Sequence, residues 1–347
     1  MKIMITGGAG FVASYLAKYC LKQGDEVICT IRWNEDLSRL PKNVHIENVE
    51  LTDLSSVIRC INKHRPDVIS HLAAQSWVPY SFDNPIYTMK NNIESTLNIL
   101  EAVRVIQIID TSNLNEGTHV LKYELNLDDG WKYNPYIHIC SSSEFYGKVN
   151  RENLPITENH PANPGNPYGV SKVGGDFLAQ LYKEYYDMRI VITRMFTHTG
   201  IGRSMMSAEN YYAKSIAELE KSGEKVIKIS DEKGMNSIRT WADVRDAVKN
   251  YYNLFKSGKT GVFNIAGETT KSIQEVLEYL IAISELNYDD LIFVQDEKFI
   301  RKIEVDKQVV DINKFKNSID WSNDISFEEL MSSLLKFWRK KLSEDKT

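Results

Sequence analysis

The chain has 347 residues, of which 42% are hydrophobic and 26% are charged, and its formal net charge is −5 at pH 7. A chain of this length can form one large α/β domain or two unequal domains. The acidic balance excludes a general attraction to nucleic acid, so any phosphate group that the protein binds must be held by local groups.

The first half of the chain alternates short β-rich runs with helical patterns. The sequence predicts strands at Lys2–Thr6, Glu26–Arg32, Val44–Glu50 and Asp67–Leu72, and helices that begin near Phe11 and Leu54. Further strands are predicted at Ile137–Ser141 and Arg189–Arg194, with a helix over Tyr168–Tyr186 between them. This alternation is typical of βαβ units and favours an α/β fold with a Rossmann-type, doubly wound parallel sheet.

The pattern becomes less regular beyond Thr199. Helices are predicted over Ser207–Ser222, over Ser272–Ile283 and from Ser326, and strands over Val226–Ile229 and Leu291–Val294. We expect residues 1–198 to form the dinucleotide-binding domain, with 239–266 returning to it, and residues 199–238 and 267–347 to form a smaller α/β C-terminal substrate lobe. The stretch from Val105 to Tyr136 contains two turn-like clusters and is expected to form a surface hairpin or an oligomer contact.

The cysteines and the apolar runs bear on where the protein works. Cys20, Cys29, Cys60 and Cys140 are widely spaced in apolar surroundings, which favours buried thiols in a reducing cytosol over a metal site or redox pair. No uninterrupted apolar stretch approaches the roughly 20 residues that span a bilayer, and the first residues turn glycine-rich too early for a signal peptide. We expect a cytoplasmic protein with no membrane partner and no metal.

A glycine-rich turn follows the first predicted strand and opens the first helix. Gly7 permits a tight turn, Gly10 lets the backbone approach a pyrophosphate, and the small Ala13 lets helix and strand pack closely. The helix begins at Phe11 and Val12, whose backbone N–H groups would face the phosphates. Glycine also simply makes turns, but its place within a βαβ rhythm favours a dinucleotide site.

The end of the second strand bears on which dinucleotide is bound. An acidic residue usually stands there to bind the adenine ribose of NAD, and this chain has Arg32 instead. Arginine suits a ribose 2′-phosphate, so NADP is favoured over NAD; the alternative is an exposed arginine with NAD tolerated. Asp53, followed by Leu54, can accept a hydrogen bond from the adenine amino group and can also cap the second helix.

The segment Asn166-Pro167-Tyr168-Gly169-Val170-Ser171-Lys172 carries the strongest catalytic signal. Asn166 can cap a helix on which Tyr168 and Lys172 lie one turn apart on the same face. A free tyrosine has a pKa near about 10, and a neighbouring ammonium group favours the phenolate, which makes Tyr168 a usable proton acceptor. Ser142, at the end of an upstream strand, supplies a hydroxyl for the reacting oxygen.

With these residues the chain resembles the extended short-chain dehydrogenase/reductase family nearly end to end. The glycine motif, His71-Leu72-Ala73-Ala74-Gln75, Asn92 with Ser95-Thr96, the serine strand and the Tyr–Lys pair all occur in family order. The resemblance implies that Ser142, Tyr168 and Lys172 form a catalytic triad. It also implies that the cofactor site is lined by Leu72, Ala73, Ala74 and Asn92.

Within that family the chain looks most like the GDP-mannose 4,6-dehydratase and GDP-6-deoxy-mannose reductase group. The similar stretches are Ser142-Ser143-Glu144, Arg194–Gly200, Ile238–Asp246 and Arg301–Val305. The resemblance implies a nucleotide diphosphate sugar as substrate, with a GDP-sugar favoured. The residues expected to bind it are Gln75, Ser76, Ser143, Thr197, Arg203, Asn210, Lys214, Arg239, Arg301 and Glu304.

Glu144 discriminates between reactions. In a 4,6-dehydratase the sugar is oxidised at carbon four, which acidifies the proton at carbon five, and a carboxylate is needed to remove it. A simple 4-epimerase needs no such group, so Glu144 favours the dehydratase. The alternatives are a GDP-sugar 4-reductase, 4-dehydrogenase or epimerase on the same scaffold and, more remotely, a non-catalytic dinucleotide sensor.

The chain departs from the group's pattern in places. Ser142 replaces the usual threonine, Thr197 the usual asparagine and Lys302 the usual proline, which suggests a shifted substrate. Relatives pair through the Tyr–Lys helix and the helix near Ile93–Val103, so we expect a homodimer, with a tetramer as the alternative. The apolar positions that would serve this contact, or an ordinary core, are Leu97, Leu100, Val103, Phe177, Leu178 and Leu181.

Overall fold

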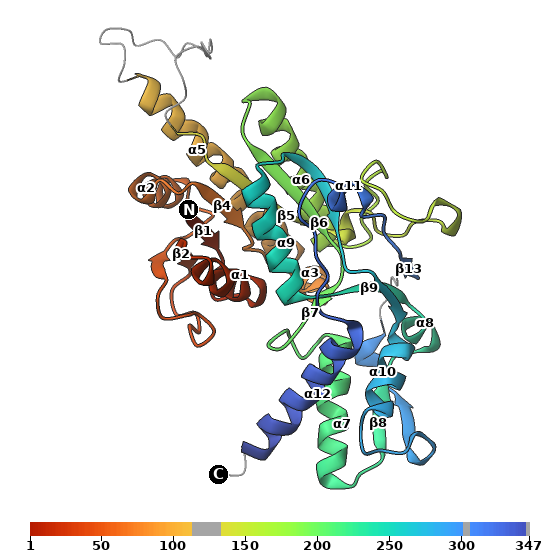
Figure 1. Cartoon of the computed structure of the whole chain (residues 1–347). Helices are drawn as coiled ribbons and strands as arrows, with labels where there is room; N and C mark the ends of the chain where they lie inside the picture. Colours follow the sequence, from red (N-terminus) through yellow and green to blue (C-terminus); the bar gives the residue numbers. More distant parts are fainter. Residues whose placement is uncertain (113–132, 301–305, 345–347) are drawn as a thin grey trace. The chain divides into compact units, whose positions relative to one another are not determined.

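A computed structural model describes residues 1–112, 133–300 and 306–344 (Figure 1). Contacts divide the chain into two compact units. The first unit comprises Met1–Phe145, Asn166–Arg194 and Tyr252–Phe263, and the second comprises Tyr146–Gly165, Met195–Tyr251 and Asn264–Thr347. Compared with the predicted boundaries, the second unit also takes residues 146–165, 195–198, 239–251 and 264–266, and within it Ile156 forms a parallel bridge with Val310.

A seven-stranded sheet forms the centre of the first unit, in the order β10–β6–β5–β4–β1–β2–β3. The strands are β1 Lys2–Thr6, β2 Glu26–Ile31, β3 His45–Asn48, β4 Val68–His71, β5 Tyr136–Ser142, β6 Ile190–Met195 and β10 Gly261–Ile265. β1 pairs in parallel with both β2 and β4, so the strand order reverses beside β1, where doubly wound sheets bind their ligands. The predicted Rossmann-type fold is confirmed, with strand ends displaced by one or two residues.

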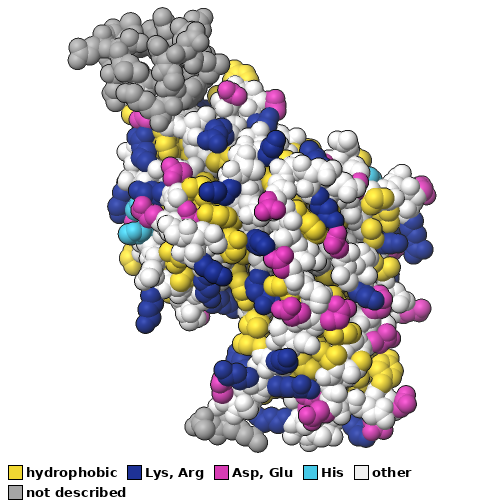
Figure 2. Space-filling model, in the orientation of Figure 1, with side chains coloured by type: hydrophobic (Ala, Val, Ile, Leu, Met, Phe, Trp, Pro, Cys, Tyr) yellow, Lys and Arg dark blue, Asp and Glu magenta, His cyan; other side chains and the backbone are white. Residues whose placement is uncertain are grey.

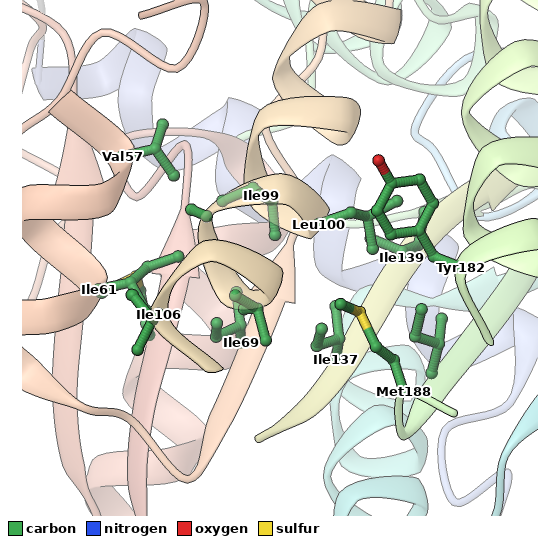
Figure 3. Close-up of a cluster of buried hydrophobic side chains, with 14 of the residues drawn as sticks. Val57, Ile61, Ile69, Ile99, Leu100, Ile106, Ile137, Ile139, Tyr182 and Met188 are labelled. Carbon is green, nitrogen blue, oxygen red and sulfur yellow. The ribbon is translucent and has the colours of Figure 1, made fainter. Parts of the chain in front are cut away.

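Helices cover both faces of this sheet. They are α1 Phe11–Lys22, α2 Leu54–His64, α3 Val78–Asp83, α4 Pro85–Met89, a π-helix at Lys90–Glu94, α5 Ser95–Ser112, α6 Pro167–Tyr185 and α9 Val244–Ser257. The α2, α5 and α6 helices bury one face, where Ile137 and Ile139 of β5 meet Leu100 and Tyr182 (Figure 3). His138, which points the other way along β5, meets Phe255 of α9 with ring centroids 5.4 Å apart. Alternate residues of one strand therefore serve two cores.

The second unit is built around β9. β9 (Ile238–Asp243) pairs antiparallel with β11 (Thr269–Ser272) and parallel with β7 (His198–Thr199) and β13 (Lys307–Gln308). A separate parallel pair joins β8 (Val226–Ile229) to β12 (Ile292–Gln295). Its helices are α7 Ala208–Ser222, α8 Glu232–Met235, α10 Ile273–Ala282, α11 Asn313–Lys316 and α12 Phe327–Glu344. Buried side chains of α7, α10 and α12 form the core of this α/β unit, whose helices and strands lie close to the predicted positions.

The segment from Val105 to Tyr136 differs from the predicted hairpin at its two ends. Residues to Ser112 continue α5, and β5 begins at Tyr136; the turn-like clusters between them lie outside the described residues. No helix of the described chain is long and apolar enough to cross a membrane. Nor do the described residues group three His, Cys, Asp or Glu side chains into a metal site.

The cysteines behave as the sequence predicts. All four are free thiols; Cys20, Cys29 and Cys60 are buried and Cys140 is half-buried. Burial raises the pKa of the Cys29 and Cys60 thiols to about 12, so neither is a reactive thiolate near neutral pH. On the face shown in Figure 2, Lys and Arg side chains are interspersed with Asp and Glu side chains, so phosphate recognition there falls to individual groups.

Candidate active site

The loop between β1 and α1 packs too closely against the loop after β4 to admit a side chain at Gly7. Gly7 has a φ of 66°, and a Cβ atom there would lie 2.9 Å from Cα of Ala73 in the loop after β4. Gly10 is the N-cap of α1 and contributes no side-chain hydrogen bond to it. Phe11 and Val12 begin the helix, as predicted. The loop therefore brings backbone alone to the switch point of the sheet, which suits a pyrophosphate.

A buried hydroxyl fixes the neighbouring loop. Oγ1 of Thr6 accepts the backbone N–H groups of Leu72 and Ala73, both at 3.1 Å, and lies 2.9 Å from Nδ1 of His71. Burial lowers the pKa of His71 to about 3, so its ring is neutral. Since Oγ1 of Thr6 already accepts two N–H groups, its own proton is the one left for Nδ1 of His71, which assigns the ring proton to Nε2, 3.4 Å from Oγ of Ser95. The network holds Ala73 beside the glycine loop.

Arg32 lies just beyond β2, where two side chains hold its guanidinium group. Its Nε donates to Oε1 of Glu35 at 3.0 Å, and its Nη1 donates to the hydroxyl of Tyr87 in α4 at 2.9 Å. Asp53, at the neighbouring strand end, caps α2 and accepts the N–H of Ser55 at 3.0 Å. The cap is as predicted, and the adenine contact stays a prediction.

The three triad residues come from β5 and α6. Ser142 ends β5 and Tyr168 lies in the first turn of α6; their exposed fractions are 9% and 8%. Nζ of Lys172 donates to the backbone oxygen of Cys140 at 2.7 Å and lies 5.9 Å from the centroid of the Tyr168 ring. Burial lowers the pKa of Lys172 below its usual value. Lys172 thus ties the helix to the strand and places its charge near the phenol.

Glu144 lies in a 3₁₀ turn that directly follows β5, between the buried Ser143 and Phe145. Its backbone N–H donates to Oγ of Ser142 at 3.2 Å, so the turn itself sets the spacing between hydroxyl and carboxylate. Its Oε2 accepts a hydrogen bond of 2.7 Å from Nδ2 of Asn166. The structure thus brings this carboxylate to the N-terminus of the helix that carries Tyr168 and Lys172.

Asn92 connects α6 to the loop after β4. Its Oδ1 accepts the N–H of Gln75 at 2.8 Å, and its Nδ2 donates to the Gln75 oxygen and to Oγ of Ser171, both at 2.9 Å. The Ser171 hydroxyl donates in turn to the backbone oxygen of Tyr168 at 2.7 Å. Asn92 is only 3% exposed, and its π-helical turn is a distortion often found at functional sites. This side chain is fully occupied in positioning other residues.

Two of the expected substrate residues adjoin that loop. The Gln75 side chain donates to Oγ1 of Thr88 at 3.0 Å, and Ser76 is exposed. A buried ion pair holds α6 to β6: the Arg194 guanidinium of β6 donates to both carboxylate oxygens of Asp176 in α6, at 2.9 and 3.1 Å. The candidate catalytic helix is therefore tied to three parts of the first unit.

The other expected substrate residues belong to the second unit. Arg203 donates to the backbone oxygen of His198 and lies 3.5 Å from a Glu209 carboxylate oxygen, and its side chain is 31% exposed. Asn210 is 1% exposed, with its amide 3.3 Å from Oγ1 of Thr199 and 3.3 Å from Oε1 of Glu209. Asn210 therefore packs inside the unit.

The remaining substrate residues lie on α7, near β7 and on β9. Lys214 of α7 pairs with Glu218 at 2.6 Å. Thr197, just before β7, is half-buried, and its backbone oxygen accepts the N–H of Ala242 at 3.0 Å. Arg239 of β9 is 9% exposed and donates to the Ile238 oxygen at 2.9 Å. Arg301, Lys302 and Glu304 lie outside the described residues.

Comparison with known proteins places this geometry in a family. A family model for GDP-mannose 4,6 dehydratase matches residues 4–334. The chain belongs to this family. Its resemblance to the extended short-chain dehydrogenase/reductase family is thereby confirmed, and with it the assignment of the protein as an enzyme of that type.

Individual relatives cover nearly the whole chain. A GDP-mannose 4,6 dehydratase from Drosophila melanogaster is 27% identical over 96% of this chain and 85% of its own. A GDP-6-deoxy-D-mannose reductase from Pseudomonas aeruginosa is 24% identical over 99% of both. Among solved structures, RMD from Pseudomonas aeruginosa complexed with NADPH has a TM-score of 0.78 at 23% identity, covering 98% of this chain and 99% of its own. DesIV, a dTDP-glucose 4,6-dehydratase from Streptomyces venezuelae with NAD bound, has a TM-score of 0.79 at 19% identity, covering 99% and 98%. These likenesses in structure show the same fold.

For a member of this family, three features of the site were not predicted. They are the bonds of Tyr87 and Glu35 to Arg32, and the bond of Asn166 to Glu144. No local pattern signals the Tyr87 and Asn166 bonds, because their partners lie 55 and 22 residues away in sequence. Glu35 lies three residues after Arg32, a spacing that allows an ion pair. The sequence has no feature that marks this pair as part of the site.

Proposed function

We propose that this chain is a GDP-sugar 4,6-dehydratase, which oxidises the sugar at carbon four, removes water across carbons five and six, and yields a 4-keto-6-deoxy sugar. The observation that carries the proposal is Glu144. Its backbone N–H is bonded to Ser142, and its carboxylate is held at the N-terminus of the helix that bears Tyr168 and Lys172. A carboxylate at this place serves the proton transfers that distinguish dehydration from simple redox chemistry.

The residues divide the work as follows. A bound nicotinamide would supply the capacity to take a hydride from carbon four and return it to carbon six after water has left, so that the C5–C6 double bond is reduced as a proton returns to carbon five. Tyr168 accepts the proton of the C4 hydroxyl, and Ser142 holds that oxygen by a hydrogen bond. The ammonium group of Lys172 stabilises the negative charge on the phenol. Once carbon four is a ketone, Glu144 takes the C5 proton and passes it to the departing C6 hydroxyl, which leaves as water.

The glycine loop fits a dinucleotide. Only glycine is tolerated at position 7, since a side chain there would collide with the loop after β4, and the resulting turn presents backbone alone to a pyrophosphate. NADP is proposed over NAD on account of Arg32. The Arg32 side chain is 56% exposed and Tyr87 orients its guanidinium group, so a 2′-phosphate can replace Glu35 as its partner. One solved relative holds NADPH and another holds NAD, so the choice depends on Arg32 itself.

A GDP-sugar is proposed from the named activities of the relatives. In the second unit, the partly exposed Arg203 is the described group best suited to a diphosphate. Arg239, Arg301 and Glu304 are proposed to complete the nucleotide site. Asn210 is also proposed to contact the substrate, with its amide nitrogen held by Thr199 and Glu209.

The test is incubation of the purified protein with GDP-mannose and with GDP-heptose, followed by mass spectrometry of the sugar nucleotide. We expect loss of one water without net use of NADPH or NADH. Unchanged mass with every GDP-sugar tried would refute the dehydratase. The reductase relative favours one rival: a 4-reductase or 4-dehydrogenase would consume or produce reduced cofactor, and an epimerase would change stereochemistry at constant mass. A dinucleotide sensor would be unaffected by Tyr168→Phe.

We propose that a second copy of this chain covers an apolar stripe on α6. Phe177, Leu181 and Tyr185 recur every four residues and are 52%, 57% and 69% exposed. Leu100 and Val103 of α5, by contrast, are fully buried within the unit and serve its core. An exposed stripe of this kind is typical of a subunit contact. Light scattering on the purified protein tests for the homodimer, with a tetramer as the alternative.

A further inference from the structure

We infer that Asn166 is a positioning residue for Glu144 and sets the rate of water loss. The inference rests on the proposed dehydratase function, because it concerns the elimination step. Asn166 is the N-cap of α6: its Oδ1 accepts the N–H of Gly169 at 2.8 Å, while its Nδ2 donates to Oε2 of Glu144 at 2.7 Å. One amide therefore joins the catalytic helix to the candidate base.

The orientation of this amide follows from its two partners. The group of Gly169 that faces the Asn166 amide is its backbone N–H, a donor, and Glu144 offers a carboxylate oxygen, an acceptor. The amide oxygen must therefore face the helix and the amide nitrogen the carboxylate. Asn166 is anchored at a helix end with extended backbone, which leaves the side chain little freedom to follow Glu144 if the carboxylate rotates. The bond to Oε2 thereby defines which carboxylate oxygen is held and which remains for the substrate.

The chemistry makes this restraint consequential. In the elimination, Glu144 takes the C5 proton, the C5–C6 double bond forms, the C6–O bond breaks, and the same proton leaves with the hydroxyl as water. One carboxylate oxygen must therefore reach the C5 proton and then the C6 hydroxyl. A carboxylate that rotates freely would spend part of its time in orientations that reach neither.

The nearby cations have other acceptors. Lys172 donates to the backbone oxygen of Cys140, and Arg194 pairs with Asp176. The backbone N–H of Glu144 is bonded to Ser142, which fixes the turn and leaves the side-chain angles open. Of the described contacts, the Asn166 amide is the one that fixes the carboxylate itself.

The experiment compares Asn166→Ser and Asn166→Asp with wild type, on a GDP-sugar that the wild type dehydrates. Serine and aspartate both cap helices about as well as asparagine, so melting temperatures should stay close to wild type. Serine is too short to reach Glu144, and aspartate brings a like charge to it. Because a hydrogen bond to a charged group is lost, we expect Asn166→Ser to slow water loss about 10- to 100-fold, and Asn166→Asp to slow it further.

Two readouts separate positioning from a merely structural role. The 4-keto sugar that still carries its C6 hydroxyl should accumulate in Asn166→Ser, because oxidation at carbon four does not use Glu144. In the Glu144→Gln background, Asn166→Ser should add little further loss, as expected when one residue acts through the other.

Asn163→Ser is the matched control, since its amide donates to the Lys148 oxygen in the preceding loop. If Asn166→Ser dehydrates at the wild-type rate without accumulating the 4-keto sugar that still carries its C6 hydroxyl, or if its effect adds fully to that of Glu144→Gln, the inference is wrong. If the wild type itself removes no water from any GDP-sugar, it is the proposed function that fails.

Discussion

Removing the carboxylate of Asp176 should destabilise the first unit more than any surface change. Asp176 of α6 and Arg194 of β6 are 0% and 4% exposed and share two hydrogen bonds, and the guanidinium carbon lies 3.5 Å from the centroid of the Phe145 ring. Deleting one member of a buried ion pair leaves the other charge without its counter-ion, at a cost of about 3–5 kcal/mol. Domains are stable by only about 5–15 kcal/mol in total.

We therefore expect Asp176→Ala to lower the melting temperature by about 6–20 °C, taking about 2–4 °C per kcal/mol for domains of this size. Thermal unfolding followed by circular dichroism measures the shift. Glu184→Ala is the control on the same helix: its pair with Lys183 is solvent-exposed and should contribute at most about 1 kcal/mol.

A second variant tests the reason for the loss. Replacing both partners, with Asp176→Leu and Arg194→Met, removes the buried charges together and should recover much of the stability lost in Asp176→Leu alone. If Asp176→Ala melts within about 2 °C of wild type, or if the double replacement is less stable than Asp176→Leu alone, the ion pair does not hold α6 to β6.

Three further predictions concern the cofactor, the subunit contact and pH. Arg32→Ala should weaken NADP binding by about 10- to 100-fold and leave NAD binding nearly unchanged, as measured by calorimetric titration; equal losses for both would count against a 2′-phosphate site. Leu181→Asp should convert the dimer to a monomer in light scattering without lowering the melting temperature of the monomer, because this side chain is 57% exposed. Burial depresses the pKa of both His71 and His138 to about 3, against about 6.5 in the unfolded chain. Since the unfolded state takes up these protons first, stability is fully present above pH 6.5 and declines below it, by about 2 kcal/mol per histidine down to pH 5; urea unfolding at pH 7 and pH 5 should show this decline, and His71→Asn should reduce it.

The fold could be predicted from the sequence where the signal is local. The turn at Gly7 follows a β-rich run and precedes a helical pattern, so the βαβ unit is legible within a dozen residues. The spacing of Tyr168 and Lys172 likewise needs only one helical turn. Strand ends were displaced by a residue or two because pairing with neighbours, which propensity does not encode, decides where a strand stops.

The site could be predicted only as a set of residues, not as an arrangement. Asn92 is predicted to line the cofactor site, and the structure adds that its amide bonds to Gln75 and Ser171, 17 and 79 residues away. Asn210 is predicted at the substrate, and its amide nitrogen lies against Thr199 and Glu209 inside the second unit. Polar residues that complete a buried network look the same in sequence as polar residues that face a ligand, since both need a donor and an acceptor at one point.

The contacts of α6 suggest why one helix carries so much of the proposed chemistry. Asn166 binds the carboxylate after β5, Ser171 binds the amide that holds the loop after β4, Lys172 binds β5 itself, and Asp176 binds β6. These four residues lie within three turns and face three successive neighbours of the sheet. A rigid body displacement of α6 would therefore move the proton acceptor, the base and the cofactor-side loop together, and relative errors between them would stay small. Removing any one of these hydrogen bonds should therefore slow the step that it serves more than it slows the other steps. The Asn166 variants test this expectation for the loss of water.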